Sequence, residues 1–301
     1  MPDAERQPTV LGFALRDAYP WMELAGLARA GEDLGYRALF LPEVGARDTL
    51  AALTGLSGET GRLLLGTGVV PIPARTPQLL AMAAATVAER SGGRLVLGLG
   101  TGPSMPGALD RLRSTVVALH AAFDGRSGRV GDQTVDLGLL PPAPPPIWIA
   151  ALGPRATALA GEIADGVILN WCTPERVAQA CEQVAEGAAR VGRDPSSVTV
   201  AVYVRAPLAP GSSGAARAAA AEYGSYPAYA RQFAAMGIDP GDPDAIVHAV
   251  MVSDPADARE RLRAYRAAGA VMPVVYPVLP PGAPSATIAR EILETVAPNP
   301  T

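Results

Sequence analysis

The chain has 301 residues, of which 49% are hydrophobic and 18% are charged, so it can bury a sizeable core in one large domain or two. Its formal net charge is −4, and its 25 basic residues are all arginine with no basic block, which argues against nucleic acid as a partner. The start, MPDAERQPT, lacks a signal-peptide pattern, and the longest apolar run, LLAMAAATVA at 79–88, is too short to span a bilayer. We therefore expect a cytoplasmic protein with no membrane partner.

Short apolar segments alternate with Ala-rich amphipathic segments along the whole chain. Strands that alternate with helices form a parallel sheet, because a parallel pair needs a long crossover connection. Eight such units predict an α/β fold, a closed (β/α)8 TIM barrel, with residues 1–301 in a single domain. The predicted strands are 10–15, 37–41, 62–68, 94–98, 147–150, 166–169, 198–205 and 271–276.

Three helix starts have a clear signature, with Thr or Asp at the cap and Pro in the first turn. They begin at Thr76, Thr173 and Asp254. Two connections are unusually long. Residues 124–146 predict a small hairpin followed by a proline-rich approach to the fifth strand, and an insertion of some 65 residues separates strands seven and eight.

The fourth and fifth strands each run into a glycine-containing turn that opens a helix. GLGTGP at 98–103 is not a dinucleotide fingerprint, since its third glycine would fall on Pro103. In either turn alone, the glycines could serve only to make a tight connection from strand to helix. On neighbouring strand ends, however, Gly100-Thr101-Gly102 and Ala151-Leu152-Gly153-Pro154-Arg155 could offer backbone N–H groups, a hydroxyl and a guanidinium to one phosphate.

The cysteines and histidines are too few and too scattered for metal chemistry. Cys172, Cys181, His120 and His248 form no metal-ligand spacing and no catalytic triad signature. No metal site is therefore expected.

Two stretches together carry a family resemblance: RTPQLLAMAAATVAERSGGRLVLGLGTG at 75–102 and PPIWIAALGPRATALAGEIADGVILNW at 145–171. They resemble the bacterial luciferase-like monooxygenase superfamily, and within it the coenzyme F420-dependent oxidoreductases related to methylenetetrahydromethanopterin reductase. The resemblance covers nearly the whole chain. It implies a (β/α)8 barrel with the flavin or deazaflavin phosphate on the two glycine turns and the ring across the barrel mouth.

The resemblance also predicts a feature at the end of the third strand, where relatives often carry a non-proline cis peptide behind the ring. The equivalent bond here is Gly68–Val69, although an ordinary trans strand end is the alternative. Other polar residues at strand ends could contact the ring or substrate, or could be satisfied within the protein. They are Arg16, Asp17, Asn170, Trp171, Tyr203, Arg205 and Tyr276, of which Asn170 is included in the predicted cofactor site.

Deazaflavin relatives place an acidic residue or an Asp-His pair after the second strand. Glu43 matches the acid and is the predicted catalytic residue, while Val44 stands at the usual histidine position. A purely structural alternative for Glu43 is an ion pair with Arg47. Some sugar-phosphate-oxidising relatives carry a catalytic Glu where Pro103 stands here, which argues against a glucose-6-phosphate type of dehydrogenase.

The insertion between strands seven and eight lies at the end of the barrel where active sites form. Residues 209–241 carry Gly-Ser, Pro and the tyrosines Tyr223, Tyr226 and Tyr229, a composition that suits a lid or substrate wall. If one helix continued past Pro227, Tyr226 and Tyr229 would share a face. The insertion could equally decorate the barrel or form a homodimer contact.

The expected activity is hydride transfer between coenzyme F420 and a small organic substrate, in the direction of reducing an activated C=C or C=N bond. An FMN-dependent monooxygenase that uses reduced flavin and O2 is the first alternative. A non-catalytic cofactor-binding barrel is the second, because Val44 and Pro103 replace two catalytic positions of relatives.

Overall fold

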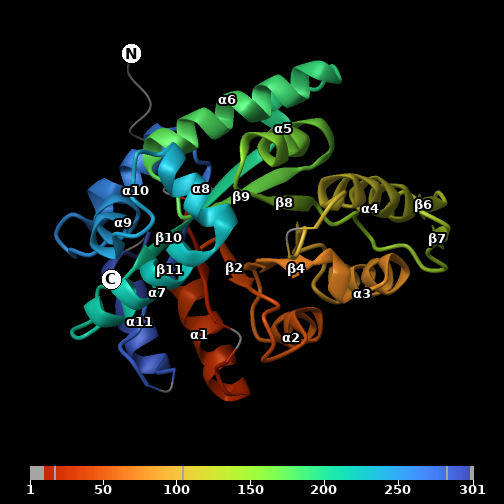
Figure 1. Cartoon of the computed structure of the whole chain (residues 1–301). Helices are drawn as coiled ribbons and strands as arrows, with labels where there is room; N and C mark the ends of the chain where they lie inside the picture. Colours follow the sequence, from red (N-terminus) through yellow and green to blue (C-terminus); the bar gives the residue numbers. More distant parts are fainter. Residues whose placement is uncertain (1–9, 17, 104, 283, 299–301) are drawn as a thin grey trace, which may run out of the picture.

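The computed structural model of the chain describes residues 10–16, 18–103, 105–282 and 284–298. Its parallel strands run in the order β3-β2-β1-β11-β10-β9-β8-β5-β4, and an additional pairing of β3 with β5 closes the sheet into a barrel (Figure 1). The predicted (β/α)8 barrel is thus confirmed. The strands are β1 (Gly12–Ala14), β2 (Ala38–Leu41), β3 (Leu64–Thr67), β4 (Val70–Pro71), β5 (Leu95–Gly100), β8 (Ile147–Ala151), β9 (Gly166–Asn170), β10 (Thr199–Ala206) and β11 (Met272–Pro277).

Helices surround the strands on the outside of the barrel (Figure 1). They are α1 (Trp21–Asp33), α2 (Thr49–Leu56), α3 (Pro77–Arg90), α4 (Ala108–Phe123), α5 (Pro154–Ile163), α6 (Pro174–Arg190), α10 (Ala258–Ala267) and α11 (Ala286–Thr295), with short 3₁₀ turns η1 (Ile72–Ala74) and η2 (Pro195–Ser197). The predicted hairpin is present as antiparallel β6 (Gly128–Val130) and β7 (Gln133–Val135).

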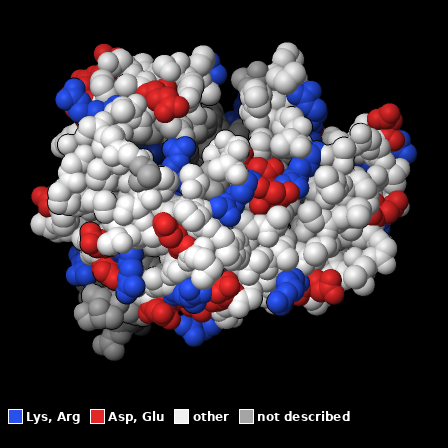
Figure 2. Space-filling model, turned by 90° about the horizontal axis from the view of Figure 1, so that it is seen from below, with Lys and Arg blue, Asp and Glu red and all other residues white. Residues whose placement is uncertain are grey.

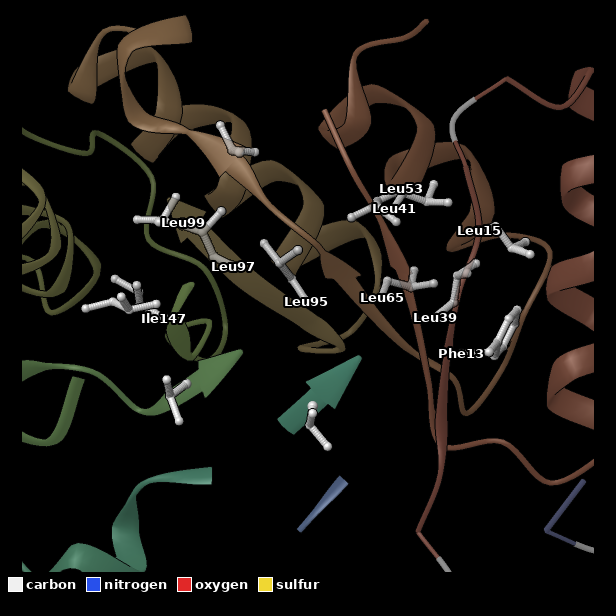
Figure 3. Close-up of a cluster of buried hydrophobic side chains, with 14 of the residues drawn as sticks. Phe13, Leu15, Leu39, Leu41, Leu53, Leu65, Leu95, Leu97, Leu99 and Ile147 are labelled. Carbon is white, nitrogen blue, oxygen red and sulfur yellow. The ribbon is translucent and has the colours of Figure 1, made fainter. Parts of the chain in front are cut away.

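Side chains on the strands alternate between two separate cores. Those that point outward pack against the helices in one large layer, part of which Figure 3 shows. Phe13, Leu39, Leu65 and Leu97 in this layer are fully buried. Each buried Leu or Phe contributes about 1.5–3 kcal/mol, so the outer layer supplies most of the hydrophobic stabilisation. The residues between them point inward and form a smaller core.

The barrel closes where β3 and β5 approach at glycines. The hydroxyl of Thr67 donates to the carbonyl oxygen of Gly98 at 2.7 Å, and a Cβ on Gly98 would lie 2.1 Å from the carbonyl oxygen of Thr67. No side chain fits there. The Gly68–Val69 peptide that follows is cis, as the resemblance implied. It separates β3, which lies within the predicted third strand, from the short β4 beyond it.

Two of the three predicted helix caps are confirmed. The hydroxyl of Thr76 accepts from the N–H of Leu79, and that of Thr173 accepts from Arg176. The start predicted at Asp254 is wrong: α10 begins four residues later, at Ala258. The Asp254 carboxylate instead accepts from the N–H of Ala256 in the turn that directly precedes α10, a local bond that competes with helix formation.

The insertion between β10 and β11 holds α7 (Ser213–Ser225), α8 (Pro227–Ala235) and α9 (Pro243–Val250) ahead of α10. The helix does not continue past Pro227, the condition under which Tyr226 and Tyr229 would share a face, because Tyr226 is extended at φ −79° and ψ 124°. A residue before proline avoids the helical region. The three helices bury a small core of their own around Trp171, with Phe233 and Ile246 fully buried.

Candidate functional site

The two glycine turns lie side by side at the barrel mouth. Strands β5 and β8 are parallel neighbours with Leu99 opposite Ile149, so the residues that follow them leave the sheet at the same edge. Gly102 has φ +70°, which explains glycine at that position. The structure therefore brings together the predicted phosphate-binding residues Gly100, Thr101, Gly102, Ala151, Leu152, Gly153, Pro154 and Arg155. Their role as ligands stays a prediction.

Helix α5 starts at this edge without a side-chain cap. Gly153 is its N-cap residue and, within the described chain, no side chain accepts from its first amides, which also lack intrahelical acceptors. A Cβ on Gly153 would meet no described protein atom within 4 Å, so the fold does not require glycine there. Exposed amides and an open approach are what an anion needs at a helix N-terminus.

The end of β3 forms one side of the mouth beside these turns, where close contacts leave no room for side chains on two glycines. A Cβ on Gly100 would lie 2.9 Å from Cγ2 of Val69, and a Cβ on Gly68 would lie 1.8 Å from the hydroxyl of Tyr203. That hydroxyl approaches the carbonyl oxygen of Gly68 at 3.5 Å. Burial raises the pKa of Tyr203, which therefore stays a neutral donor. The predicted residues Gly68, Val69 and Gly100 thus adjoin one another.

Glu43 follows β2 and is held by an ion pair with Arg75. Its carboxylate accepts from Nε of Arg75 at 3.0 Å and from Nη2 at 2.8 Å, and it also accepts from the N–H of Thr49 at 3.2 Å. The Glu43 N–H donates to the carbonyl oxygen of Val69 at 3.3 Å, which places Glu43 beside the cis peptide. The catalytic role of Glu43 stays a prediction, and these contacts account for the residue structurally.

The partner of Glu43 differs from the one considered from sequence. Arg75 lies 32 residues along the chain, whereas the side chain of the expected partner Arg47 donates to the carbonyl oxygen of Tyr19. Arg75 also pairs with Asp48 at 2.7 Å. Partial burial would raise the pKa of Asp48, but hydrogen bonds from Arg75 and from the backbone N–H of Ala51 in the first turn of α2 lower it below its usual value. One guanidinium therefore joins two carboxylates at this edge.

The exposed fractions of the Glu43 and Arg75 side chains are 14% and 10%, so this pair is largely shielded from water. We expect Glu43→Gln to lower the free energy of unfolding by about 1–3 kcal/mol, because it removes a charge from a partly buried pair. The matched control Glu294→Gln breaks an exposed pair with Arg290 and should lower it by less than about 0.5 kcal/mol. Denaturant unfolding measures both. Unchanged stability of Glu43→Gln, with turnover lowered by roughly 100-fold, would instead support proton handling by Glu43.

Asn170 lies in the other half of the mouth, in a polar network at the ends of β9 and β10. Its side-chain oxygen accepts from Nη1 of Arg205 at 2.6 Å, and its Nδ2 donates to the hydroxyl of Tyr229 at 3.2 Å. Burial raises the pKa of Tyr229 to about 12. The next residue, Trp171, is buried with φ +55°, and its carbonyl oxygen accepts from Nε2 of Gln232 on α8. A left-handed tryptophan is strained, and such residues gather at functional sites.

A pocket of about 310 Å³ opens beside this network, between the ends of β1, β10 and β11 and the face of α7. Its described lining includes Arg16, Arg205 and Tyr276, three of the polar strand-end residues that the sequence analysis named. None of the predicted phosphate-binding residues is among the described lining. Asp17 lies outside the described residues. The sequence reading missed Glu222 of α7 and the proline-rich wall at 277–282, although PVLPPG directly after a barrel strand is a usable signal.

The inserted helices form a wall of this pocket. Ala215, Ala219 and Tyr223 of α7 line it, and the opposite side of α7 buries Ala216 and Ala220 completely. The rings of Tyr223 and Tyr229 meet edge to face at 4.8 Å. This packing supports the substrate-wall interpretation of residues 209–241, while closure as a lid stays a prediction.

Charge on the surface is mixed. Figure 2 shows one face on which arginine and acidic side chains are interspersed among larger uncharged areas. In the part of the chain that the structure describes, no helix is long and apolar enough to cross a bilayer, and no three His, Cys, Asp or Glu side chains are placed to hold a metal ion.

Comparison with known proteins gives a family and a set of relatives. The model of the luciferase-like monooxygenase family matches residues 7–272. The chain is similar to the 5,10-methylenetetrahydromethanopterin reductase of Methanolobus tindarius, with 30% identity over 198 residues that cover 61% of each protein. It is also similar to the F420-dependent glucose-6-phosphate dehydrogenase of Nakamurella multipartita, with 34% identity over 175 residues that cover 48% of this chain and 51% of the relative. The matched regions span less than two thirds of these relatives.

A solved structure shares the fold over almost the full length. It is an F420-dependent secondary alcohol dehydrogenase in complex with an F420–acetone adduct. The TM-score is 0.78, and the alignment covers 98% of this chain and 100% of that one. At 18% identity, the likeness shows a common fold.

Proposed function

Because the chain belongs to the luciferase-like monooxygenase family, we propose that it is an F420-dependent oxidoreductase that transfers a hydride between the deazaflavin and a small organic substrate. The choice of cofactor is supported by the similar proteins whose names include F420 dependence. The choice of hydride chemistry follows from the cofactor, since a deazaflavin supplies two-electron transfer when bound.

The observation that carries this proposal is the uncapped start of α5 beside the glycine turn after β5. The cofactor phosphate would be held by the backbone N–H groups of Gly153, Arg155 and Ala156, the Thr101 hydroxyl and the exposed Arg155 side chain. The side of the mouth formed by Gly68, Val69 and Gly100 would face the ring. The residues present therefore fit a phosphate-bearing, planar cofactor.

The protein's own residues would then position and shield the reacting groups. The pocket beside α7 is the candidate substrate position, because it adjoins the mouth and contains none of the predicted cofactor-binding residues. Its wall of alanine, proline and tyrosine side chains would exclude water from the reacting atoms, and holding both partners at close approach supplies much of the rate. Reduction of an activated C=C or C=N bond is the proposed direction, since Pro103 replaces the catalytic Glu of sugar-phosphate-oxidising relatives.

We expect the purified protein to bind F420 with micromolar affinity and FMN much more weakly. Quenching of F420 fluorescence on addition of protein measures the first, and a matched FMN titration measures the second. FMN retained through purification, together with no response of F420, would replace the proposal by an FMN-dependent monooxygenase. Binding of F420 without turnover of any activated C=C or C=N compound would favour a non-catalytic barrel.

The phosphate position can be tested at Gly153, because a side chain there has room in the fold. Gly153→Val should weaken F420 binding by more than tenfold, or about 1.4 kcal/mol, by blocking the approach to the α5 amides. Gly138→Val is the matched control, an exposed glycine whose Cβ would also meet nothing within 4 Å. Gly102 is unsuitable for this test, since its positive φ would strain any variant. Unaltered affinity in folded Gly153→Val would place the phosphate elsewhere.

A further inference from the structure

Arg205 is a buried cation for which the described part of the chain offers no charged partner. Its residue is 6% exposed, and the structure records no Asp or Glu within 4.0 Å of its guanidinium among the described residues. Its one recorded side-chain hydrogen bond runs from Nη1 to the neutral amide oxygen of Asn170. The donors on Nε and Nη2 have no acceptor in the described chain.

Aromatic rings hold the Arg205 guanidinium in place. Its central carbon lies 3.9 Å from the ring centroid of Trp171, 5.1 Å from that of Tyr223 and 5.2 Å from that of Tyr276. Cation–π contacts of this kind attract an arginine and fix the plane of its guanidinium. The contacts with three rings and one neutral amide do not fully compensate for the desolvation cost of the buried charge. A bound anion would compensate for the remainder.

The guanidinium faces the pocket beside α7, whose other charges favour an anion. Arg16 lines the same pocket from the exposed end of β1. The acid at its rim, Glu222, already accepts a hydrogen bond from the hydroxyl of Tyr226 at 2.6 Å. The remaining walls are largely apolar, with Ala219 and Leu279 among them. The pocket thus combines one buried positive group with apolar sides.

We propose that this pocket binds the substrate through a carboxylate group, and that Arg205 is the residue that recognises it. A carboxylate matches the planar fork of an arginine with two parallel hydrogen bonds, and the free donors on Nε and Nη2 are on one side of the guanidinium. The substrate class is therefore an organic acid with an apolar body. This inference takes the reaction from the proposed function, on which it rests. What it adds is the substrate group that the protein recognises.

The position of Arg205 also connects the pocket to the mouth. Tyr203 lies two residues earlier on the same inward face of β10, and its hydroxyl reaches Gly68. A carboxylate on Arg205 would leave the body of the acid between α7 and the side of the mouth formed by Gly68. Recognition and reaction would occupy adjacent positions.

The test uses hydrocinnamate, a saturated acid that cannot be reduced at a C=C bond, and its neutral amide. We expect calorimetry on the wild-type protein to show the acid binding at least about tenfold more tightly than the amide. Trp171 stacks on Arg205, so acid binding should also change the tryptophan emission. Arg205→Met should weaken acid binding by about 10- to 100-fold and abolish the emission change, while leaving amide binding nearly unaltered.

Two further variants keep the test decisive. Arg205→Lys retains the charge and loses the fork, so it should fold and show an intermediate loss of acid affinity. Arg231→Met removes one positive charge from the exposed face of α8 and should leave acid binding unchanged. Equal affinity for acid and amide, unaltered acid binding in both Arg205 variants, or tighter binding of inorganic phosphate than of hydrocinnamate would each overturn the proposal.

Cofactor titration separates this proposal from the proposed function. If wild type and Arg205→Met bind F420 equally and only acid binding depends on Arg205, the result supports both the proposed function and the carboxylate site. Arg205-dependent acid binding to a protein that does not bind F420 supports the pocket and contradicts the cofactor. Loss of F420 affinity in Arg205→Met would assign Arg205 to the cofactor and overturn the carboxylate site.

Discussion

The alternation of side chains along the barrel strands is the constraint on which the rest of this structure depends. Outward positions carry Leu, Ile, Val and Phe, and the helices bury them in one continuous layer. Because that layer supplies most of the hydrophobic stabilisation, the stability of the barrel does not depend on large apolar residues at the inward positions of the mouth. They are glycine at Gly68 and Gly100, where Tyr203 and Val69 leave no room for a Cβ, and they are polar at Asn170 and Arg205 on the other side.

This division gives the mouth two unlike halves. The half at β3, β5 and β8 carries Gly68 and Gly100 and ends in the uncapped start of α5, which suits a group with a phosphate. The half at β1, β10 and β11 is hollow and holds a buried guanidinium under the wall of α7. Tyr203 connects the two, since it follows the inward face of β10 and its hydroxyl reaches the carbonyl oxygen of Gly68. A reaction between a bound cofactor and a substrate needs two sites placed in this way.

Local signals in the sequence predicted the barrel well. Strand alternation, glycine turns and the caps at Thr76 and Thr173 depend on residues close together in the chain. The ion pair of Glu43 with Arg75 could not be predicted in this way, because it joins residues 32 apart through the packing of two strand ends. Arg205 was one of several polar strand-end residues, and its burial against three rings depends on inserted helices whose placement the sequence does not reveal. The break at Tyr226, by contrast, follows from Pro227 and was open to prediction.

We infer that the cofactor and the organic acid occupy different halves of one mouth. Titration of F420 fluorescence in the absence and presence of saturating hydrocinnamate tests it most directly. We expect both ligands to bind together, with the F420 dissociation constant changed by no more than about threefold, a small coupling between neighbouring sites. An apparent F420 dissociation constant that rises in proportion to the hydrocinnamate concentration would show competition for one position and contradict it.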